Sequence, residues 1–209
     1  LDSGLYKKAL EKKLWSLEVI NIRDYALDKH KTVDDTPFGG GSGMVMRADV
    51  IANSLDKSIN DKGEPIIYLS PKGKKFDQIY AKKLLSKNIN IICGHFEGVD
   101  ERLLETRNIE EISVGDFILS GGEVGALVII DAIVRLIPGV LGNSNSLTDE
   151  TFERNLLEYP QYTKPQKWEE KDVPEVLLTG DHAKIKGWRL EQSEDITRRR
   201  RPDLWKKYK

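Results

Sequence analysis

Three short apolar runs separated by helical stretches constrain the fold of this chain more than any other feature. The runs 66–69, 89–93 and 112–119 indicate buried strands, and the segments 76–85 and 99–106 between them indicate helices. Parallel neighbours in a sheet need a crossover connection, which an intervening helix supplies. The order strand, helix, strand, helix, strand therefore predicts an α/β fold with a mainly parallel sheet.

Each of these strands is followed by a turn that contains glycine or proline. The turns are 70–73, 94–98 and 120–122, and in a parallel sheet they meet at the carboxyl ends of the strands, where ligands bind. Glycine lets main-chain groups approach a ligand without a Cβ in the way. We therefore predict one binding site, built from three loops, for a small, flat, polar molecule.

The usual nucleotide-binding signatures are missing from the sequence. There is no G-x-x-x-x-G-K-[ST], and the glycine run 39–43 fails to complete G-x-G-x-x-G because Met44 stands where the last glycine would be. The sequence thus disfavours a P-loop NTPase and an ordinary Rossmann dehydrogenase.

Composition narrows the class of protein further. Of the 209 residues, 39% are hydrophobic and 32% charged, which is typical of a globular protein. A single cysteine, Cys93, excludes an internal disulfide framework and favours a reducing compartment, by default the cytoplasm. The three histidines have no metal-ligand spacing, so we predict no zinc site. The longest apolar stretch, 124–140, contains Asp131 and Arg135 and is too short and too charged to span a membrane comfortably.

The rest of the chain divides by composition. Residues 122–136 predict a helix that is apolar nearly all round, packed on the sheet or in a subunit interface. Residues 143–152 are polar and aperiodic, which indicates an interdomain linker. We predict domains at 1–142 and 153–209, the second small and mostly helical with one helix over about 182–192. The chain opens on Leu1 inside a helical pattern, so we expect its natural N-terminus to be missing.

Charged residues are distributed unevenly along the chain, although its net charge is only −1. Residues 182–209 hold ten Lys or Arg against four Asp or Glu, including the run Arg198 to Arg201. Such a local excess suits a phosphate backbone. A solvated helix end or a flexible tail explains the arginine run equally simply.

Several candidate functional residues have a structural alternative. Arg135 stands in an apolar helix, where a guanidinium is costly to desolvate, but a helix C-terminus favours a cation. Asp149 and Glu150 fit a solvated loop or an N-cap, and Glu97 is as compatible with a turn as with a ligand contact. The same holds for Asp116. We expect the polar segment 31–43 to be a long structureless loop of the lid or binding kind.

With these motifs the chain resembles the bacterial tRNA (guanine-N(1)-)-methyltransferases, the TrmD family of the SPOUT class. The resemblance runs from about Asp24 to Leu204. It is carried by the blocks 23–25, 30–43, 68–73, 94–102, 114–123, 135–142, 157–165, 173–180 and 188–190.

The resemblance implies an activity and a fold that composition does not reveal. It implies S-adenosyl-L-methionine as methyl donor, the guanine 3′-adjacent to the tRNA anticodon as acceptor, and dependence on Mg²⁺. It also implies a homodimer with the active site at the interface, and a deep trefoil knot in domain 1–142, although chains almost never knot. Domain 153–209 would then bind tRNA.

The resemblance also assigns site residues. It places cofactor binding on Tyr68, Leu69, Pro71, Gly94, Phe96, Glu97, Gly98, Val114, Gly115, Phe117, Leu119, Gly121 and Gly122. The family's catalytic arginine falls on Arg135. Its catalytic aspartate precedes a Ser-Phe pair and here corresponds to Glu150, before Thr151 and Phe152, so we expect Glu150 to be the general base and Asp149 the alternative.

Two other functions stay open from the sequence. The chain could be a related knotted methyltransferase with another RNA target. It could also be a non-catalytic RNA-binding module that uses its basic C-terminal helices.

Overall fold

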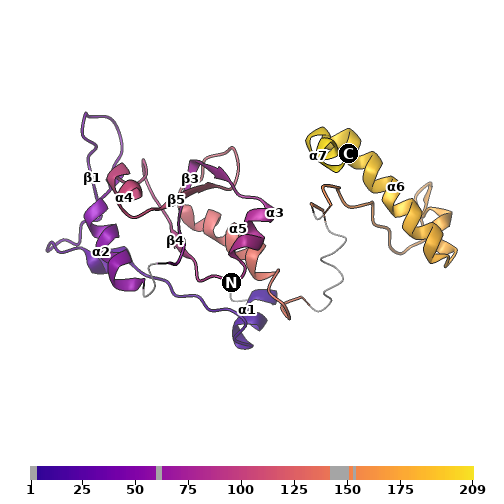
Figure 1. Cartoon of the computed structure of the whole chain (residues 1–209), viewed down its shortest axis with the longest axis horizontal. Helices are drawn as coiled ribbons and strands as arrows, with labels where there is room; N and C mark the ends of the chain where they lie inside the picture. The colour runs from indigo at the N-terminus through magenta and orange to yellow at the C-terminus, as the bar shows by residue number, and fades with distance from the viewer. Residues whose placement is uncertain (1–3, 60–62, 142–150, 153) are drawn as a thin grey trace. The chain divides into compact units, whose positions relative to one another are not determined.

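The computed structural model describes residues 4–59, 63–141, 151–152 and 154–209. The chain divides into two compact units, Leu1–Gly142 and Asn143–Lys209. Figure 1 labels the helices α1 to α7 and the strands β1, β3, β4 and β5.

A three-stranded parallel sheet forms the centre of the first unit. Strand β3 (Ile66–Lys75) lies between β4 (Asn90–Ile92) and β5 (Glu110–Ser113), and both pairings are parallel. Helices α3 (Gln78–Leu84) and α4 (Glu101–Thr106) make the two crossover connections. The predicted alternation and the parallel sheet are confirmed.

Helices cover both faces of this sheet. In Figure 1, α2 (Ala48–Ser58) and α4 lie on one side of the strands, and α3 and α5 (Gly122–Val134) on the other. The alternation of β3 explains this arrangement, because successive side chains point to opposite faces of a sheet. Tyr68 packs with the α2 and α4 core, whereas Leu69 faces Gly125 of α5.

The C-terminal end of α5 packs against the first helix of the chain. Helix α1 (Gly4–Glu11) buries Ala9 in a cluster with Val134 and Val140. The predicted helix over 122–136 is thereby confirmed, with its end two residues earlier than expected.

Strand β3 is longer than the sequence predicts. We expected it to end at Leu69, but Leu69 and Lys74 both pair with Ile112 of β5, so the intervening residues form an interruption inside the strand. Pro71 lacks an N–H for the ladder, and an added Cβ on Gly73 would overlap the backbone of Glu111 and Ile112. The turn exists where predicted, but the chain returns to the same neighbour after it.

Strand β5 is shorter than predicted. It ends at Ser113 rather than at Leu119, because the Ser113 hydroxyl both accepts from the backbone N–H of Gly115 (3.2 Å) and donates to its carbonyl (3.1 Å). Gly115 has φ +155°, and the N–H of Phe117 donates back to the Gly115 carbonyl. The apolar residues after Ser113 therefore belong to a turn.

The segment 31–43 is not entirely structureless, as we had expected it to be. Residues Asp34–Asp35 (β1) pair antiparallel with Val45–Met46 (β2) after a short 3₁₀ helix η1 (Ile22–Tyr25). The glycines between the two strands have positive φ, which allows the tight return.

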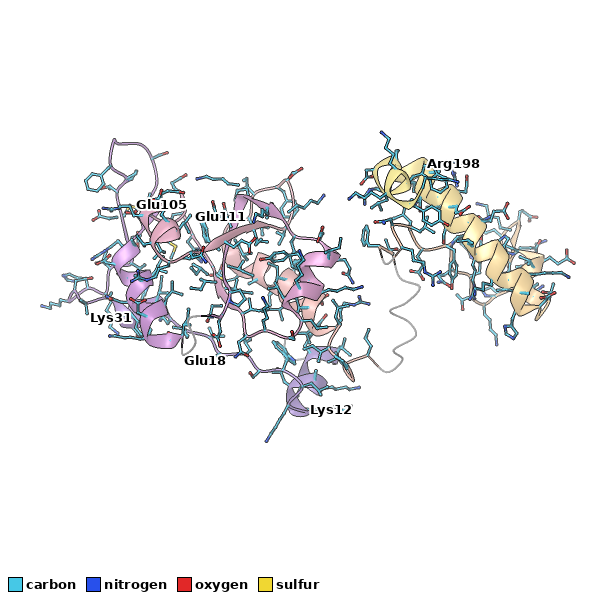
Figure 2. All side chains as sticks on the ribbon, in the orientation of Figure 1. Lys12, Glu18, Lys31, Glu105, Glu111 and Arg198 are labelled. Carbon is cyan, nitrogen blue, oxygen red and sulfur yellow. The ribbon has the colours of Figure 1, made fainter. Side chains whose placement is uncertain are left out.

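The second unit contains helix α6 (His182–Arg200), helix α7 (Pro202–Tyr208), the 3₁₀ helix η3 (Glu175–Leu178) and a hairpin of β6 (Lys167–Trp168) and β7 (Lys171–Asp172). Helix α6 continues eight residues beyond the predicted end at 192. Asp195 pairs with Arg198 and Arg199 one turn later, an arrangement that supports an exposed helix. The first three arginines of the run, 198–200, therefore form the last turn of α6, and Arg201 is its C-cap. Arg198 is labelled in Figure 2. Among the described residues no helix has the length and apolar character needed to cross a membrane.

Candidate active site

A cavity of about 290 Å³ lies at the carboxyl ends of the three parallel strands. Its wall consists of the turn inside β3, the turn after β4, and the segment between β5 and α5. Every residue that the resemblance assigns to cofactor binding lines this cavity. The three predicted loops therefore line one cavity, and the binding of a ligand there stays a prediction.

Glycines of the β4 turn form one wall around the ring of Tyr68. An added Cβ on Gly94 would lie 2.6 Å from Tyr68 Cε2, and one on Gly98 would lie 3.0 Å from the hydroxyl. Tyr68 is buried, and burial, with the charge of Glu111 adding to it, raises the pKa of its hydroxyl. The phenol therefore stays neutral.

The N-terminus of α5 joins this wall through its first glycine. The backbone N–H of Gly122 donates to the Gly94 carbonyl at 2.9 Å, and an added Cβ would meet Cys93 Cα at 2.7 Å. The neighbouring Cys93 has its pKa raised to about 11 by burial and by the charge of Glu123. Because the thiolate is the nucleophilic form, Cys93 is not a candidate nucleophile near neutral pH.

The charges around the cavity favour a cationic ligand. Three carboxylates, those of Glu97, Glu101 and Glu111, line it, and Lys72 is the lysine of its wall. Glu111 is labelled on β5 in Figure 2. Opposite charges attract more strongly in a partly enclosed site than in bulk water.

The hairpin of β1 and β2 is attached to the same wall, which the sequence did not predict. The backbone N–H of Glu97 donates to the Met44 carbonyl, and that of Met46 donates to the Gly98 carbonyl. An added Cβ on Gly43 would overlap the Glu97 side chain. The glycine-rich segment thus supports the β4 turn, and Glu97 lies between the two.

Two aromatic side chains of the cavity wall remain exposed. Phe96 has φ +56°, a strained conformation for a residue other than glycine, and is 60% exposed. Phe117 is folded against Gly115, where an added Cβ would overlap its ring. Both rings are available to a flat ligand, whereas Asp116, the other carboxylate considered, does not line the cavity.

Of the residues expected to do the chemistry, the structure describes only Arg135, and Arg135 does not line this cavity. Arg135 caps the C-terminus of α5, half-buried, whereas the cavity lies at the N-terminus of that helix. Thirteen helical residues separate the two ends, which at 1.5 Å per residue is about 20 Å. Asp149 and Glu150 lie outside the described residues.

Some lining residues lie outside the three turns that the sequence assigns to the site. They are Val99, Glu101, Leu104, Glu111, Ile112, Ser113, Ile118 and Gly125. Ser70, Lys72, His95 and Ser120 lie inside those turns, but neither the turn pattern nor the resemblance gives them a role of their own.

Comparison with known proteins agrees with this geometry. Residues 1–207 match the family described as tRNA (Guanine-1)-methyltransferase TrmD. The chain belongs to this family. The tRNA (guanine-N(1)-)-methyltransferase of Pelagibacter ubique (strain HTCC1062) is 69% identical over 210 residues, covering 100% of this chain and 92% of that protein.

More distant members of the TrmD family cover the chain equally well. The tRNA (guanine-N(1)-)-methyltransferase of Bartonella tribocorum is 56% identical over 209 residues, covering 100% of this chain and 89% of its own length. That of Wolbachia pipientis wMel is 52% identical over 208 residues, covering 98% of this chain and 88% of that protein. Both units of the chain are therefore parts of the TrmD family sequence.

Proposed function

We propose that this chain transfers a methyl group from S-adenosyl-L-methionine to the N(1) nitrogen of the guanine 3′-adjacent to the tRNA anticodon. The match of residues 1–207 to the TrmD family carries the proposal. The cavity at the carboxyl edge of the sheet supports it, because that edge is where α/β proteins bind ligands.

The cavity suits the donor in shape and charge. Gly94, Gly98, Gly121 and Gly122 line the cavity, and an added Cβ at each would crowd neighbouring protein atoms, so these glycines let the wall of the cavity pack closely. When bound, S-adenosyl-L-methionine supplies a methyl group on a positively charged sulfonium, and the carboxylates of the wall complement that charge. The turns hold the ligand in place, and positioning is the main requirement of an in-line displacement.

The acceptor nitrogen needs help from the protein, since it carries a proton and is a poor nucleophile until that proton is lost. A carboxylate of pKa roughly 4 is a weak base for such a proton. Arg135, beside the exocyclic oxygen of the guanine, would stabilise the negative charge that develops there, and Glu150 would accept the proton. We keep Asp149 as the alternative base.

The proposal includes a homodimer. Val124, Leu127 and Val128 of α5 are spaced on one face of the helix and are 54%, 45% and 48% exposed. An apolar helix face of this kind is typical of a subunit interface. A second copy packed there would also bring its own Arg135 to the interface, whereas the Arg135 of the same chain lies about 15 Å along α5 from Gly125 of the cavity wall.

The second unit would bind tRNA. Arg189 lies 4.7 Å from the centroid of the Tyr159 ring, and Trp188 pairs with Tyr162 at 6.2 Å. Guanidinium and aromatic groups of this kind contact phosphates and unstacked bases. The target base must leave the anticodon stack before it can reach a buried cofactor.

Four further expectations remain proposals. The trefoil knot rests on membership of the TrmD family alone. Magnesium has no candidate site of three or more acidic, His or Cys ligands among the described residues, and we assign it no step. The domains keep the predicted bounds 1–142 and 153–209 with a linker at 143–152. We place the enzyme in the cytoplasm.

The decisive experiment maps the methylated nucleoside. Unmodified tRNA transcripts with guanine 3′ of the anticodon are incubated with donor and enzyme, then digested and analysed by mass spectrometry. We expect 1-methylguanosine at that position and none in a matched transcript with adenine there. Methylation elsewhere would support the related knotted methyltransferase, and tRNA binding without donor binding would support the non-catalytic module.

The base is assigned by a second experiment. Single-turnover methyl transfer is measured for Glu150→Gln and Asp149→Asn. We expect the rate to collapse for Glu150→Gln and to stay near that of the wild type for Asp149→Asn. The opposite pattern would make Asp149 the base.

A further inference from the structure

We infer that His95 and Glu123 form a positioning pair that ties the β4 turn to the N-terminus of α5 and thereby sets the affinity for the methyl donor. The inference rests on the proposed function, since it concerns the donor cavity. His95 Nε2 lies 2.6 Å from Glu123 Oε1, within hydrogen-bond distance. Neither residue is assigned a role by the resemblance.

The two members of the pair occupy different elements of the cavity wall. His95 lines the cavity from the β4 turn, whereas Glu123 lies in the first turn of α5 and is not part of the lining. Glu123 thus holds the imidazole without contacting the ligand space itself. The pair covers Gly121, where an added Cβ would lie 2.6 Å from Glu123 Oε2 and 2.8 Å from His95 Cε1.

The β4 turn has a conformation that needs such support. Phe96, directly after His95, has a positive φ, which residues other than glycine adopt only when their surroundings enforce it. The backbone of His95 is fixed by an N–H contact to Met46 Sδ (3.2 Å) and by its carbonyl, which accepts from Gly98 N–H (3.1 Å). The Glu123 carboxylate fixes the His95 side chain.

The electrostatics agree with a donor on the imidazole and an acceptor on the carboxylate. Burial is the largest single influence and raises the pKa of Glu123, but the hydrogen bond from His95, a backbone hydrogen bond and the charge of His95 together outweigh it, and the pKa is lowered overall. The other titratable groups nearby are the Cys93 thiol, whose raised pKa keeps it neutral, and Glu97 of the same turn. A carboxylate that stays ionised keeps the imidazole in one orientation.

A backbone hydrogen bond joins the same two elements as the pair of His95 and Glu123. The hydrogen bond from Gly122 N–H to the Gly94 carbonyl already joins the same two turns. Loss of the side-chain contact therefore leaves the fold intact and loosens the wall. Because the side chains are 43% and 58% exposed, the effect on affinity is modest.

The test is a double-mutant cycle read by calorimetric titration with S-adenosyl-L-methionine. We expect His95→Leu and Glu123→Leu each to raise the donor Kd about two- to fivefold. The donor Kd of the double variant should be no higher than that of the single variant with the higher Kd. His95→Gln, which retains a donor, should remain closer to the wild type. At saturating donor, kcat should change less than KM for the donor.

A matched ion pair away from the cavity is the control. Arg107 pairs with Asp56 at 2.8 Å, with side chains 36% and 55% exposed, and neither residue lines the cavity. Arg107→Leu and Asp56→Leu should leave the donor Kd unchanged. Equal weakening by this pair, or additive effects within the His95 and Glu123 cycle, would overturn the inference.

The outcomes separate this inference from the proposed function. If the wild type fails to bind the donor, the proposed function falls and the inference falls with it. If the wild type binds and the His95 and Glu123 variants bind equally well, only the pair is refuted. Should His95→Leu not fold, the cycle with His95→Ala and Glu123→Ala decides by the same criterion of coupling.

Discussion

Substitution of Gly122 by alanine tests whether close backbone packing forms the donor cavity. An added Cβ would lie 2.7 Å from Cys93 Cα and 2.9 Å from the Gly94 nitrogen. Apolar atoms prefer a separation of about 3.5–4.0 Å, so α5 and the β4 turn must move apart by roughly 1 Å. These neighbours are backbone atoms, and they cannot rotate away as a side chain would.

The cost of Gly122→Ala follows from that displacement. Overpacking costs about 1–3 kcal/mol, and stretching the Gly122 to Gly94 hydrogen bond removes about 0.5–1.5 kcal/mol more. The higher helix propensity of alanine returns at most about 1 kcal/mol. We expect a net loss of about 1–3 kcal/mol in the free energy of unfolding of the first unit, with a donor Kd raised at least tenfold.

Native-state hydrogen exchange of the β3, β4 and β5 amides measures this loss in the first unit, and calorimetry measures the donor Kd. The matched control is Gly187→Ala in α6, where an added Cβ meets nothing within 4 Å. Alanine there should stabilise α6 by up to about 1 kcal/mol and leave donor binding unchanged. Wild-type stability and affinity for Gly122→Ala would refute the reasoning.

Three further predictions concern the second unit. Thr197→Val should cost about 1–3 kcal/mol in urea denaturation, because the fully buried hydroxyl accepts from Leu157 N–H at 2.7 Å; a neutral result would contradict that account. The hydrogen bond and charge of Arg201 lower the pKa of Asp203 to about 2, below its unfolded value of about 4. The stability that the ionised Asp203 carboxylate gives to the folded state should therefore be present above pH 4 and be lost as the pH falls towards 2. Circular dichroism should show that loss in the wild type and not in Asp203→Asn. Replacing all four residues 198–201 by glutamine should weaken tRNA binding and flatten its salt dependence; an unchanged slope would leave the run as a solvated helix end.

The parallel sheet and its three turns could be predicted because each rests on a local signal. Apolar runs of strand length separated by charged helical segments leave few arrangements other than a parallel sheet. Once the sheet is parallel, Gly94 and Gly121 must lie at one edge. The position of the cavity in the fold could therefore be predicted from the sequence alone.

The predicted ends of β3 and α6 were wrong because tertiary contacts decide where these two elements end. The return of β3 to Ile112 after Leu69 depends on the close approach of Gly73 to β5, which no local pattern encodes. The extension of α6 to Arg200 was missed because this helix has no apolar stripe and buries only Ser193 and Thr197. Its stability comes from ion pairs and from packing of those two small polar residues.

The structure gives Arg135 a structural role at the end of α5 and leaves its proposed catalytic role open. From the sequence, the cost of a charge in an apolar helix suggested a catalytic role. In the structure Arg135 caps the C-terminus of α5, half-buried, where the helix dipole favours a cation, so the cost is smaller than supposed.

What remains is a separation of about 15 Å along α5 between that cap and Gly125, the lining residue of α5 that lies nearest to it. An arginine side chain cannot cover this distance. In the proposed homodimer, Arg135 would serve the cavity of a second copy, packed on the exposed face of Val124, Leu127 and Val128. Mixing an Arg135→Gln chain with a chain whose cavity carries Gly94→Ala should then restore activity that neither variant has alone, and failure of this complementation in confirmed heterodimers would exclude the shared site.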